Sequence, residues 1–443
     1  QHAAERELRA AVEEHRAQGG TVILLEPWSG EILAMANWPT FNPNAFSRYP
    51  VWQHRNRAIQ EIYEPGSTFK IVTASAALEE RLVDPADVID VSAGAIRLGA
   101  RVIDDVHRYD RLSFTDVIVK SSNVGAVRIG LKLGAERLGR YVRRFGFGQT
   151  LSPDFRGESP GIVWDPARLD DSALASVSMG YQVGVTPLQM AAAVASIANG
   201  GELVQPRVVR AIGRGPQRVE TERRVLRRTV SPRTAAVLTG IMEAVVERGT
   251  ARAARLDDYQ VAGKTGTAAK LVDGRYSRSD YIASFVGFVP SRRPALVVLV
   301  VLDSPRRGGY YGGQVAAPVF KRIAEAALRH LGVPPTINPV PPVLVAARRD
   351  DGPQPTPAVA TRLHPSVLRP VRQGTMPDLA GLGARAALRL TARLGLHAAL
   401  EGDGIVVAQE PAPGEPVEPG GACTLVLRRE RPADAEARRG EGQ

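Results

Sequence analysis

Residues 259–303 read YQVAGKTGTAAKLVDGRYSRSDYIASFVGFVPSRRPALVVLVVLD, and they carry the strongest β-strand signal of the chain. Its apolar and alternating runs predict three β-strands, at Tyr259–Lys270, Tyr281–Val289 and Ala295–Asp303. The Asp273-Gly274 dipeptide is typical of the tight turn of an antiparallel hairpin, and it lies between the first two runs. We therefore expect Lys264-Thr265-Gly266-Thr267 to lie on a strand of an antiparallel sheet.

The beginning of the chain carries a similar pattern. Thr21–Glu26 and Glu31–Asn37 read as two strands joined by a turn at Pro27-Trp28-Ser29-Gly30. Phe114–Asn199 is mostly helical in its spacing, and Val315–Leu331 reads as an amphipathic helix. The expected fold class is α/β (α+β): an antiparallel sheet built from both ends of the segment and flanked by helices, with a helical block inserted between its strands.

Two further motifs accompany the strand motif. Ser67-Thr68-Phe69-Lys70 follows Glu64-Pro65-Gly66 and opens a predicted helix, and Ser121-Ser122-Asn123 lies in or beside a loop between helices. A serine hydroxyl is a poor nucleophile that needs a base, and lysine can be that base only while uncharged. One helical turn separates Ser67 from Lys70, and the amides at a helix N-terminus stabilise developing negative charge. The pattern predicts an active-site serine.

Lysine usage supports this interpretation. The chain has six lysines among 57 basic residues, so arginine is its default cation. Arginine does not lose its proton in a protein, whereas a buried or crowded lysine does. Lys70 and Lys264 both lie inside the motifs, which favours a chemical role for the pair.

Composition limits the other functional classes. The 443 residues are 44% hydrophobic and 23% charged, which is ordinary for globular domains. The net charge is +11, but the arginines are scattered and not interleaved with aromatic residues, so we expect no nucleic-acid partner. Cys423 is the one cysteine, which excludes an internal disulfide, and the seven histidines lack ligand spacing. We expect no metal and no cofactor.

The sequence also suggests how the chain is divided. No run approaches the roughly 18 apolar residues that a membrane helix needs. The chain starts at Gln1 without methionine, inside a charged helix-like stretch at Ala3–Ala17, so we expect a fragment whose natural start is missing. The expected divisions are a remnant helix at 1–19, a main domain at 20–335, a proline-rich linker at 336–371, a small domain at 372–429 and a disordered tail at 430–443.

Over about Gly20–Pro335 the chain resembles the class B penicillin-binding proteins, the monofunctional D,D-transpeptidases of peptidoglycan synthesis. The stretches that carry the resemblance are Tyr63–Lys70, Lys120–Asn123, Gly184–Gln189, Gly263–Thr267 and Tyr311–Gly313, in that order. Met376–Leu382 and Gln409–Gly414 resemble one PASTA module. The resemblance implies a transpeptidase-like fold followed by a small α+β PASTA domain.

The resemblance also implies a mechanism. Ser67 would attack the carbonyl between two D-alanines of a stem peptide, with Lys70 as base and Ser121 passing the proton to the leaving amine. Asn123 would hold Lys70 and the substrate, and the backbone amides of Ser67 and Thr267 would form an oxyanion hole. β-Lactams would acylate the same serine. The expected catalytic residues are Ser67, Lys70, Ser121, Asn123 and Lys264, and the expected substrate-binding residues are Thr265, Gly266 and Thr267.

For Gly266 the expected role is to let the substrate backbone come close, and for Thr265 and Thr267 to contact its terminal carboxylate. The implied partners are peptidoglycan stem peptides on lipid-linked or nascent strands, β-lactam antibiotics, and membrane proteins of the divisome or elongasome. The implied location is the inner membrane with the catalytic domain in the periplasm, the anchor being absent from this chain.

Alternatives remain open at this point. A β-lactam hydrolase or sensor, or a D,D-carboxypeptidase, shares these motifs. The ExxLN context of class A hydrolases is not evident, and a class D enzyme or sensor would more often have valine where Asn123 stands. A catalytically silent wall-binding scaffold is the non-enzyme alternative, and the intact motifs argue against it.

Overall fold

Five antiparallel strands form the central sheet, in the order β11-β12-β13-β1-β2. The strands drawn from the two ends of the segment meet where β1 pairs with β13, with Gly19 opposite Asp303 and Leu25 opposite Val297. The expected sheet and its inserted helical block are confirmed. The five strands are β1 (Gly19–Leu25), β2 (Ile32–Trp38), β11 (Ala262–Val272), β12 (Arg275–Val289) and β13 (Leu296–Asp303).

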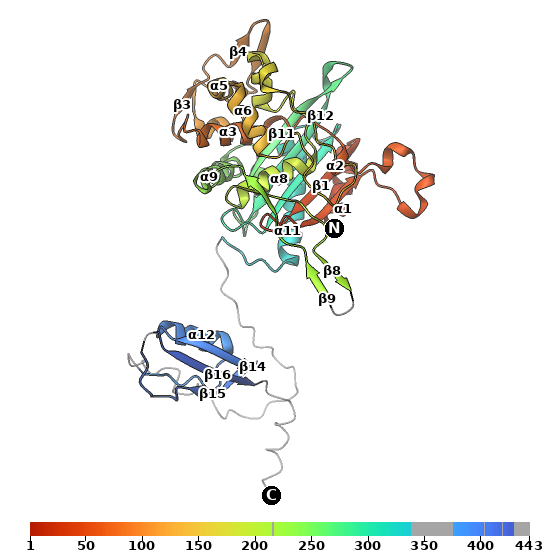
Figure 1. The fold of residues 1–443 in the computed structure, drawn as a ribbon. Helices are drawn as coiled ribbons and strands as arrows, with labels where there is room; N and C mark the ends of the chain where they lie inside the picture. The colour runs from red at the N-terminus through yellow and green to blue at the C-terminus, as the bar shows by residue number, and fades with distance from the viewer. Residues whose placement is uncertain (215–216, 338–374, 403, 419, 429–443) are drawn as a thin grey trace, which may run out of the picture. The chain divides into compact units, whose positions relative to one another are not determined.

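The structure is a computed structural model that describes residues 1–214, 217–337, 375–402, 404–418 and 420–428. The chain divides into two compact units, Gln1–Leu344 and Val345–Gln443. In Figure 1 the described residues of the first unit run from red to cyan, and those of the second are blue. The predicted linker at 336–371 and the predicted tail at 430–443 lie almost wholly outside the described residues.

The predicted hairpin turn is present at Asp273-Gly274. Both residues have positive φ, 49° and 78°, as a tight turn of the hairpin type requires. The turn sets Val272 opposite Arg275, and β12 therefore starts six residues before the predicted Tyr281. The first residues of β12 are polar on both faces of the strand. They show no alternation of apolar and polar residues, so this part of the strand was not predicted.

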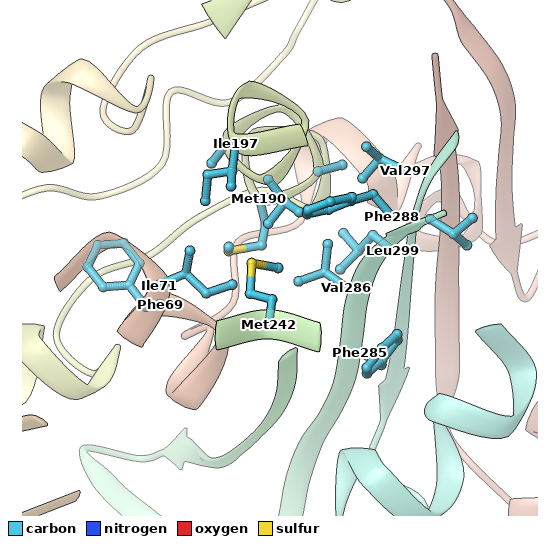
Figure 2. Packing of buried hydrophobic residues seen from close by; sticks show 14 of the residues in the cluster. Phe69, Ile71, Met190, Ile197, Met242, Phe285, Val286, Phe288, Val297 and Leu299 are labelled. Carbon is cyan, nitrogen blue, oxygen red and sulfur yellow. The ribbon is translucent and has the colours of Figure 1, made fainter. Parts of the chain in front are cut away.

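Helices cover both faces of the sheet. Phe285 of β12 packs edge-on against Phe320 of α11, with ring centroids 4.7 Å apart. Val286 and Phe288 alternate to the other face, where Figure 2 shows them with Met190 of α8 and Met242 of α9. Phe69 and Ile71 are also drawn in that cluster. The main core therefore joins the sheet directly to the start of α3.

The helices of the first unit surround this core. Proline at N1 and a reciprocal Thr186–Gln189 capping box begin α8, the wholly buried central helix. The α-helices are α1 (His2–His15), α2 (Arg57–Gln60), α3 (Lys70–Glu79), α4 (Phe114–Val119), α5 (Asn123–Leu133), α6 (Ala135–Arg144), α7 (Asp171–Met179), α8 (Pro187–Ala198), α9 (Pro232–Arg248), α10 (Gly312–Val315) and α11 (Ala317–His330). The 3₁₀ helices are η1 (Pro43–Arg48), η2 (Val51–His54), η3 (Gly66–Phe69), η4 (Pro166–Arg168) and η5 (Arg252–Ala254).

Four small two-stranded sheets were not predicted from the sequence. Their strands are three or four residues long, too short for an alternating pattern to stand out. They pair β3 with β6, β4 with β5, β7 with β10, and β8 with β9. The strands are β3 (Val88–Asp90), β4 (Ala95–Leu98), β5 (Arg101–Asp104), β6 (Arg111–Ser113), β7 (Glu202–Val204), β8 (Ala211–Arg214), β9 (Gln217–Glu220) and β10 (Val225–Arg228).

The helix expected at the start of the chain is α1. Its Ala4, Leu8, Ala11 and Val12 are buried in the same hydrophobic cluster as the central sheet. The helix is thus packed as part of the first unit. Among the described residues, no helix combines the length and the apolar character needed to cross a bilayer.

The second unit is a three-stranded sheet with one helix. The strand order is β14-β16-β15, with β14 parallel and β15 antiparallel to β16. Its own core includes Met376, Leu379, Val406, Cys423 and Leu425. The predicted helix and following strands are confirmed, as α12 (Ala384–Arg393), β14 (His397–Gly402), β15 (Ile405–Glu410) and β16 (Ala422–Arg428).

Candidate active site

Ser67 lies in the 3₁₀ helix η3, immediately before α3. The prediction of a helix that begins near Ser67 is confirmed. Its first turn is the 3₁₀ helix η3, and α-helical structure begins at Lys70. Gly66 has φ +54°, and its amide donates to the Gly180 carbonyl at 3.0 Å. This bond fixes the chain where it enters the 3₁₀ helix. The Thr68 hydroxyl donates back to Pro65 at 2.9 Å. Ser67 is therefore held on a rigid turn and is half-buried.

Lys70 is the first residue of α3 and is completely buried. Its Nζ donates to the Asn123 side-chain oxygen at 2.8 Å and to the Ser121 carbonyl at 2.7 Å. The Ser121 hydroxyl is 3.5 Å from the same nitrogen. Three residues of two motifs that lie far apart in the sequence therefore meet at one amine.

Ser121 occupies the junction between α4 and α5. Its φ is +60°, a left-handed conformation that is uncommon for a residue other than glycine and that clusters at functional sites. Lys264 Nζ donates to its hydroxyl at 2.9 Å. The Ser121 side chain thus lies between the amines of Lys70 and Lys264.

Asp105, which was not predicted from the sequence, holds this junction. Its carboxylate accepts from the Ser122 hydroxyl at 2.6 Å and from the Val124 amide at 3.1 Å, and it also accepts from the Asn123 amide. It satisfies amides at the N-terminus of α5, where a negative charge is favoured. The sequence signal was one acid in an unassigned loop, and only the fold brings it to Asn123.

The two lysines have strongly perturbed proton affinities. Burial lowers the pKa of Lys70 from its ordinary value to about 7, and the negative charge of Asp105 opposes this decrease. Burial, and then the positive charge of Lys70, place the pKa of Lys264 well below its usual range. Burial is therefore the main cause for both lysines, and the repulsion between them further lowers the pKa of Lys264.

Thr265 and Thr267 lie on β11, the edge strand of the sheet. The Thr265 hydroxyl is 2.7 Å from that of Thr250, and the Thr267 hydroxyl accepts from the Gly312 amide at 3.0 Å. Both threonines line the same cavity as Ser67. Their hydroxyls are thus fixed by neighbours from the ends of α9 and α10.

Close packing within the protein requires a glycine at position 266. A Cβ at this position would lie 2.3 Å from the Ser284 hydroxyl and 2.9 Å from the Pro65 carbonyl. Protein atoms, not open space, therefore occupy the position of the missing side chain. The glycine lets β11 pack closely on η3, which sets the separation between Ser67 and the strand motif.

A cavity of 720 Å³ joins these residues. Its lining includes Ser67, Ser121, Asn123, Thr265 and Thr267, which come from all three motifs. Within the described part of the chain, no hydrogen bond joins the Ser67 hydroxyl to Lys70. Such contacts are often long in a ligand-free site and shorten when a substrate binds. The described residues contain no cluster of His, Cys, Asp and Glu suited to a metal ion.

The chain matches two protein-family models. The penicillin binding protein transpeptidase domain matches residues 20–325, and the PASTA domain matches residues 374–428. The first match covers more than half of the chain, so the protein belongs to the penicillin-binding protein transpeptidase family.

Relatives and solved structures agree. Stage V sporulation protein D of Bacillus subtilis is 36% identical over 76% of this chain and 53% of the relative. Peptidoglycan D,D-transpeptidase FtsI of Escherichia coli is 35% identical over 74% of this chain and 54% of the relative. The chain thus spans about half the length of these curated relatives.

A crystal structure of penicillin binding protein 3 from Mycobacterium tuberculosis, complexed with ampicillin, superposes with a TM-score of 0.72 at 33% identity. It covers 77% of this chain and 78% of that one. The expected fold, a transpeptidase domain with a PASTA domain, is therefore confirmed.

Proposed function

We propose that the protein is a serine D,D-transpeptidase that crosslinks peptidoglycan stem peptides and is acylated by β-lactams. The observation that carries the proposal is the position of Ser121 between two buried lysines in the cavity that Ser67 lines. A lysine with a pKa of about 7 is partly neutral near neutral pH and can accept a proton.

In the proposed acylation, Lys70 takes the proton of Ser67 as its Oγ forms a bond to the carbonyl carbon between two D-alanines. The carbon–nitrogen bond then breaks, and the proton that Lys70 accepted passes through the Ser121 hydroxyl to the leaving amine. Lys264 orients Ser121 by donating a hydrogen bond to its hydroxyl, and Asn123 keeps Lys70 oriented. The backbone amides of Ser67 and Thr267 are proposed to stabilise the oxyanion, worth about 3 kcal/mol per donor.

The acyl group is then transferred to an amine of a neighbouring stem peptide, which forms the crosslink and frees Ser67. In this proposal Thr265 and Thr267 bind the terminal carboxylate of the donor, since both hydroxyls line the cavity. The proposed role of Gly266 is to allow β11 and η3 to lie close together, which sets the spacing between them.

The proposed domain boundaries are 20–335 for the transpeptidase and 372–429 for the PASTA domain. The family matches at 20–325 and 374–428 support them, with α1 packed onto the first domain. The curated relatives include FtsI, which supports an extracytoplasmic location and a role in division, together with membrane proteins of the division or elongation machinery as partners.

The decisive experiment is mass spectrometry of the folded protein after incubation with benzylpenicillin. We expect one adduct, on the peptide that contains Ser67, and none in the Ser67→Ala variant. Ser75→Ala, in the adjoining helix α3, is the matched control and should label normally. A folded protein without an adduct on the Ser67 peptide would overturn the proposal.

The rival activities need a second measurement. Slow release of a fluorescent penicillin is expected for a transpeptidase, whereas rapid turnover would indicate a hydrolase. A stem-peptide donor incubated with an amine acceptor should give the crosslinked product. Hydrolysis alone, with no product of the amine, would indicate a carboxypeptidase. Binding to wall polymer without any acylation would indicate a scaffold.

A further inference from the structure

Residues 304–311 link β13 to α10, and the last two of them lie in the wall of the Ser67 cavity. Tyr310 and Tyr311 of this loop line the cavity together with Tyr281 of β12. The Tyr310 ring stacks on Tyr281 with centroids 4.3 Å apart, and on Tyr311 with centroids 4.5 Å apart. Because the three rings form one stack, the backbone path of the loop determines where Tyr310 and Tyr311 lie in the cavity wall.

The loop has a weak point just before the tyrosines. Gly308 and Gly309 have φ of +76° and +106°, and glycine carries the least backbone restraint of any residue. Beyond them, the Gly312 amide donates to Thr267 at 3.0 Å and fixes the far end. For Tyr310 and Tyr311 to keep their positions, the loop must also be fixed at residues before Gly308.

His15, the last residue of α1, supplies contacts at this near end. Its carbonyl accepts from the Arg306 amide at 2.8 Å and from the Arg307 amide at 3.0 Å. Its Nδ1 lies 3.0 Å from the Arg307 carbonyl, a contact that requires the proton on Nδ1. One residue therefore makes three hydrogen bonds to the loop.

The surroundings of His15 favour a fixed side chain. Only 9% of the residue is exposed, and a Cβ on Gly308 would lie 3.2 Å from the ring nitrogen, so the loop also packs against the ring. Arg306 provides a second attachment through Asp280 and the Ser279 carbonyl. The imidazole is the contact nearest to the two glycines, because it bonds the residue that directly precedes Gly308.

We propose that His15 is a positioning residue for the active-site cavity. It fixes the 304–311 loop through Arg307 and thereby positions the three tyrosines that line the cavity together with Ser67. The inference rests on the proposed function only for its kinetic consequence. Its structural consequence, the protection of the loop, stands apart from any activity. Through His15, helix α1 at the start of the sequence contacts the loop that contributes to the cavity wall, at Arg307, 292 residues later.

The test compares His15→Ala, His15→Asn and His15→Gln with the wild type. An asparagine amide can place a donor near the position of Nδ1, whereas a glutamine amide extends toward Nε2. His330→Ala is the matched control, since His330 is also the last residue of a helix but is exposed. Acylation by a fluorescent penicillin is measured as a second-order rate constant, together with thermal unfolding and hydrogen exchange of the 304–314 peptide.

We expect His15→Ala and His15→Gln to acylate about fivefold to tenfold more slowly, the value of one lost hydrogen bond. Exchange of the 304–314 peptide should accelerate in both, while the β11 peptide keeps its protection. His15→Asn and His330→Ala should match the wild type in both measurements. A merely structural role would lower the unfolding temperature without this selective loss of protection or rescue by asparagine.

Two results would overturn the inference. One is unchanged protection of the 304–314 peptide in His15→Gln, and the other is faster exchange there with unchanged acylation. If His15→Ala fails to fold, the comparison of the asparagine and glutamine variants still decides. If the wild type itself is not acylated, the proposed function fails, whereas the exchange measurement still tests how His15 holds the loop.

Discussion

The Nζ atom of Lys264 lies 2.9 Å from the hydroxyl of Ser121, although 143 positions separate the two residues. The contact joins the edge strand of the sheet to the helical block. On its other side, the Ser121 hydroxyl lies 3.5 Å from Lys70. The Ser121 hydroxyl therefore lies between the two amines, as the proposed proton transfer from Lys70 to a leaving amine requires.

Acylation should depend on pH with a midpoint near 7. Lys70 acts as a base only when neutral, and its pKa is about 7. The rate constant for acylation by a fluorescent penicillin should therefore rise between about pH 6 and pH 8 and then level off. Stopped-flow measurements at constant ionic strength test this. A rate that falls over this range would exclude Lys70 as the base.

Burial of Lys70 should also appear in the stability of the protein. Its pKa is lowered in the folded state, so above pH 7 the unfolded state binds more protons than the folded state. The free energy of unfolding should then rise with pH relative to Lys70→Met, by up to about 1.4 kcal/mol per pH unit. Urea unfolding of both proteins at pH 7, 8 and 9 measures the difference. Parallel pH dependences would contradict the shift.

Removal of the Asp105 charge should shift the midpoint of the pH dependence of the acylation rate to lower pH. Asp105 raises the pKa of Lys70, so Asp105→Asn should lower that pKa and shift the midpoint to lower pH. The plateau rate should fall about tenfold, because the acceptor that holds Ser122 and α5 is weakened. Asp104→Asn is the control, since Asp104 holds Asn123 through its backbone carbonyl. An identical profile for both variants would refute the role of Asp105.

Gly266→Ala should damage the site through packing. The new Cβ would meet Ser284 and Pro65, so we expect a loss of about 1–3 kcal/mol in stability and slower acylation as η3 moves from β11. Gly240→Ala is the matched control, because no atom lies within 4 Å of its added Cβ and it is inside α9. That variant should gain about 0.5–1 kcal/mol. Calorimetry of the two variants measures the difference in their stability. A Gly266→Ala variant as stable as the wild type would refute the packing argument.

Much of the fold was predictable because its signals are local. The strands near Thr21, Tyr281 and Ala295 were recognised from their largely apolar runs, and Asp273-Gly274 from the residue types that a tight turn requires. The small sheets between Val88 and Ser113 were missed because their strands are too short to carry a period. The helix start near Ser67 was predicted, but the 3₁₀ type of its first turn was not, because it accompanies a long-range hydrogen bond between Gly66 and Gly180.

The sequence by itself determined which groups could react: the hydroxyls of Ser67 and Ser121, and the amines of Lys70 and Lys264. It could not determine their proton affinities, the part that Asp105 plays, or the reason for Gly266. Those depend on which side chains the folded chain buries together, because desolvation and close approach act only between groups that tertiary packing has already placed side by side.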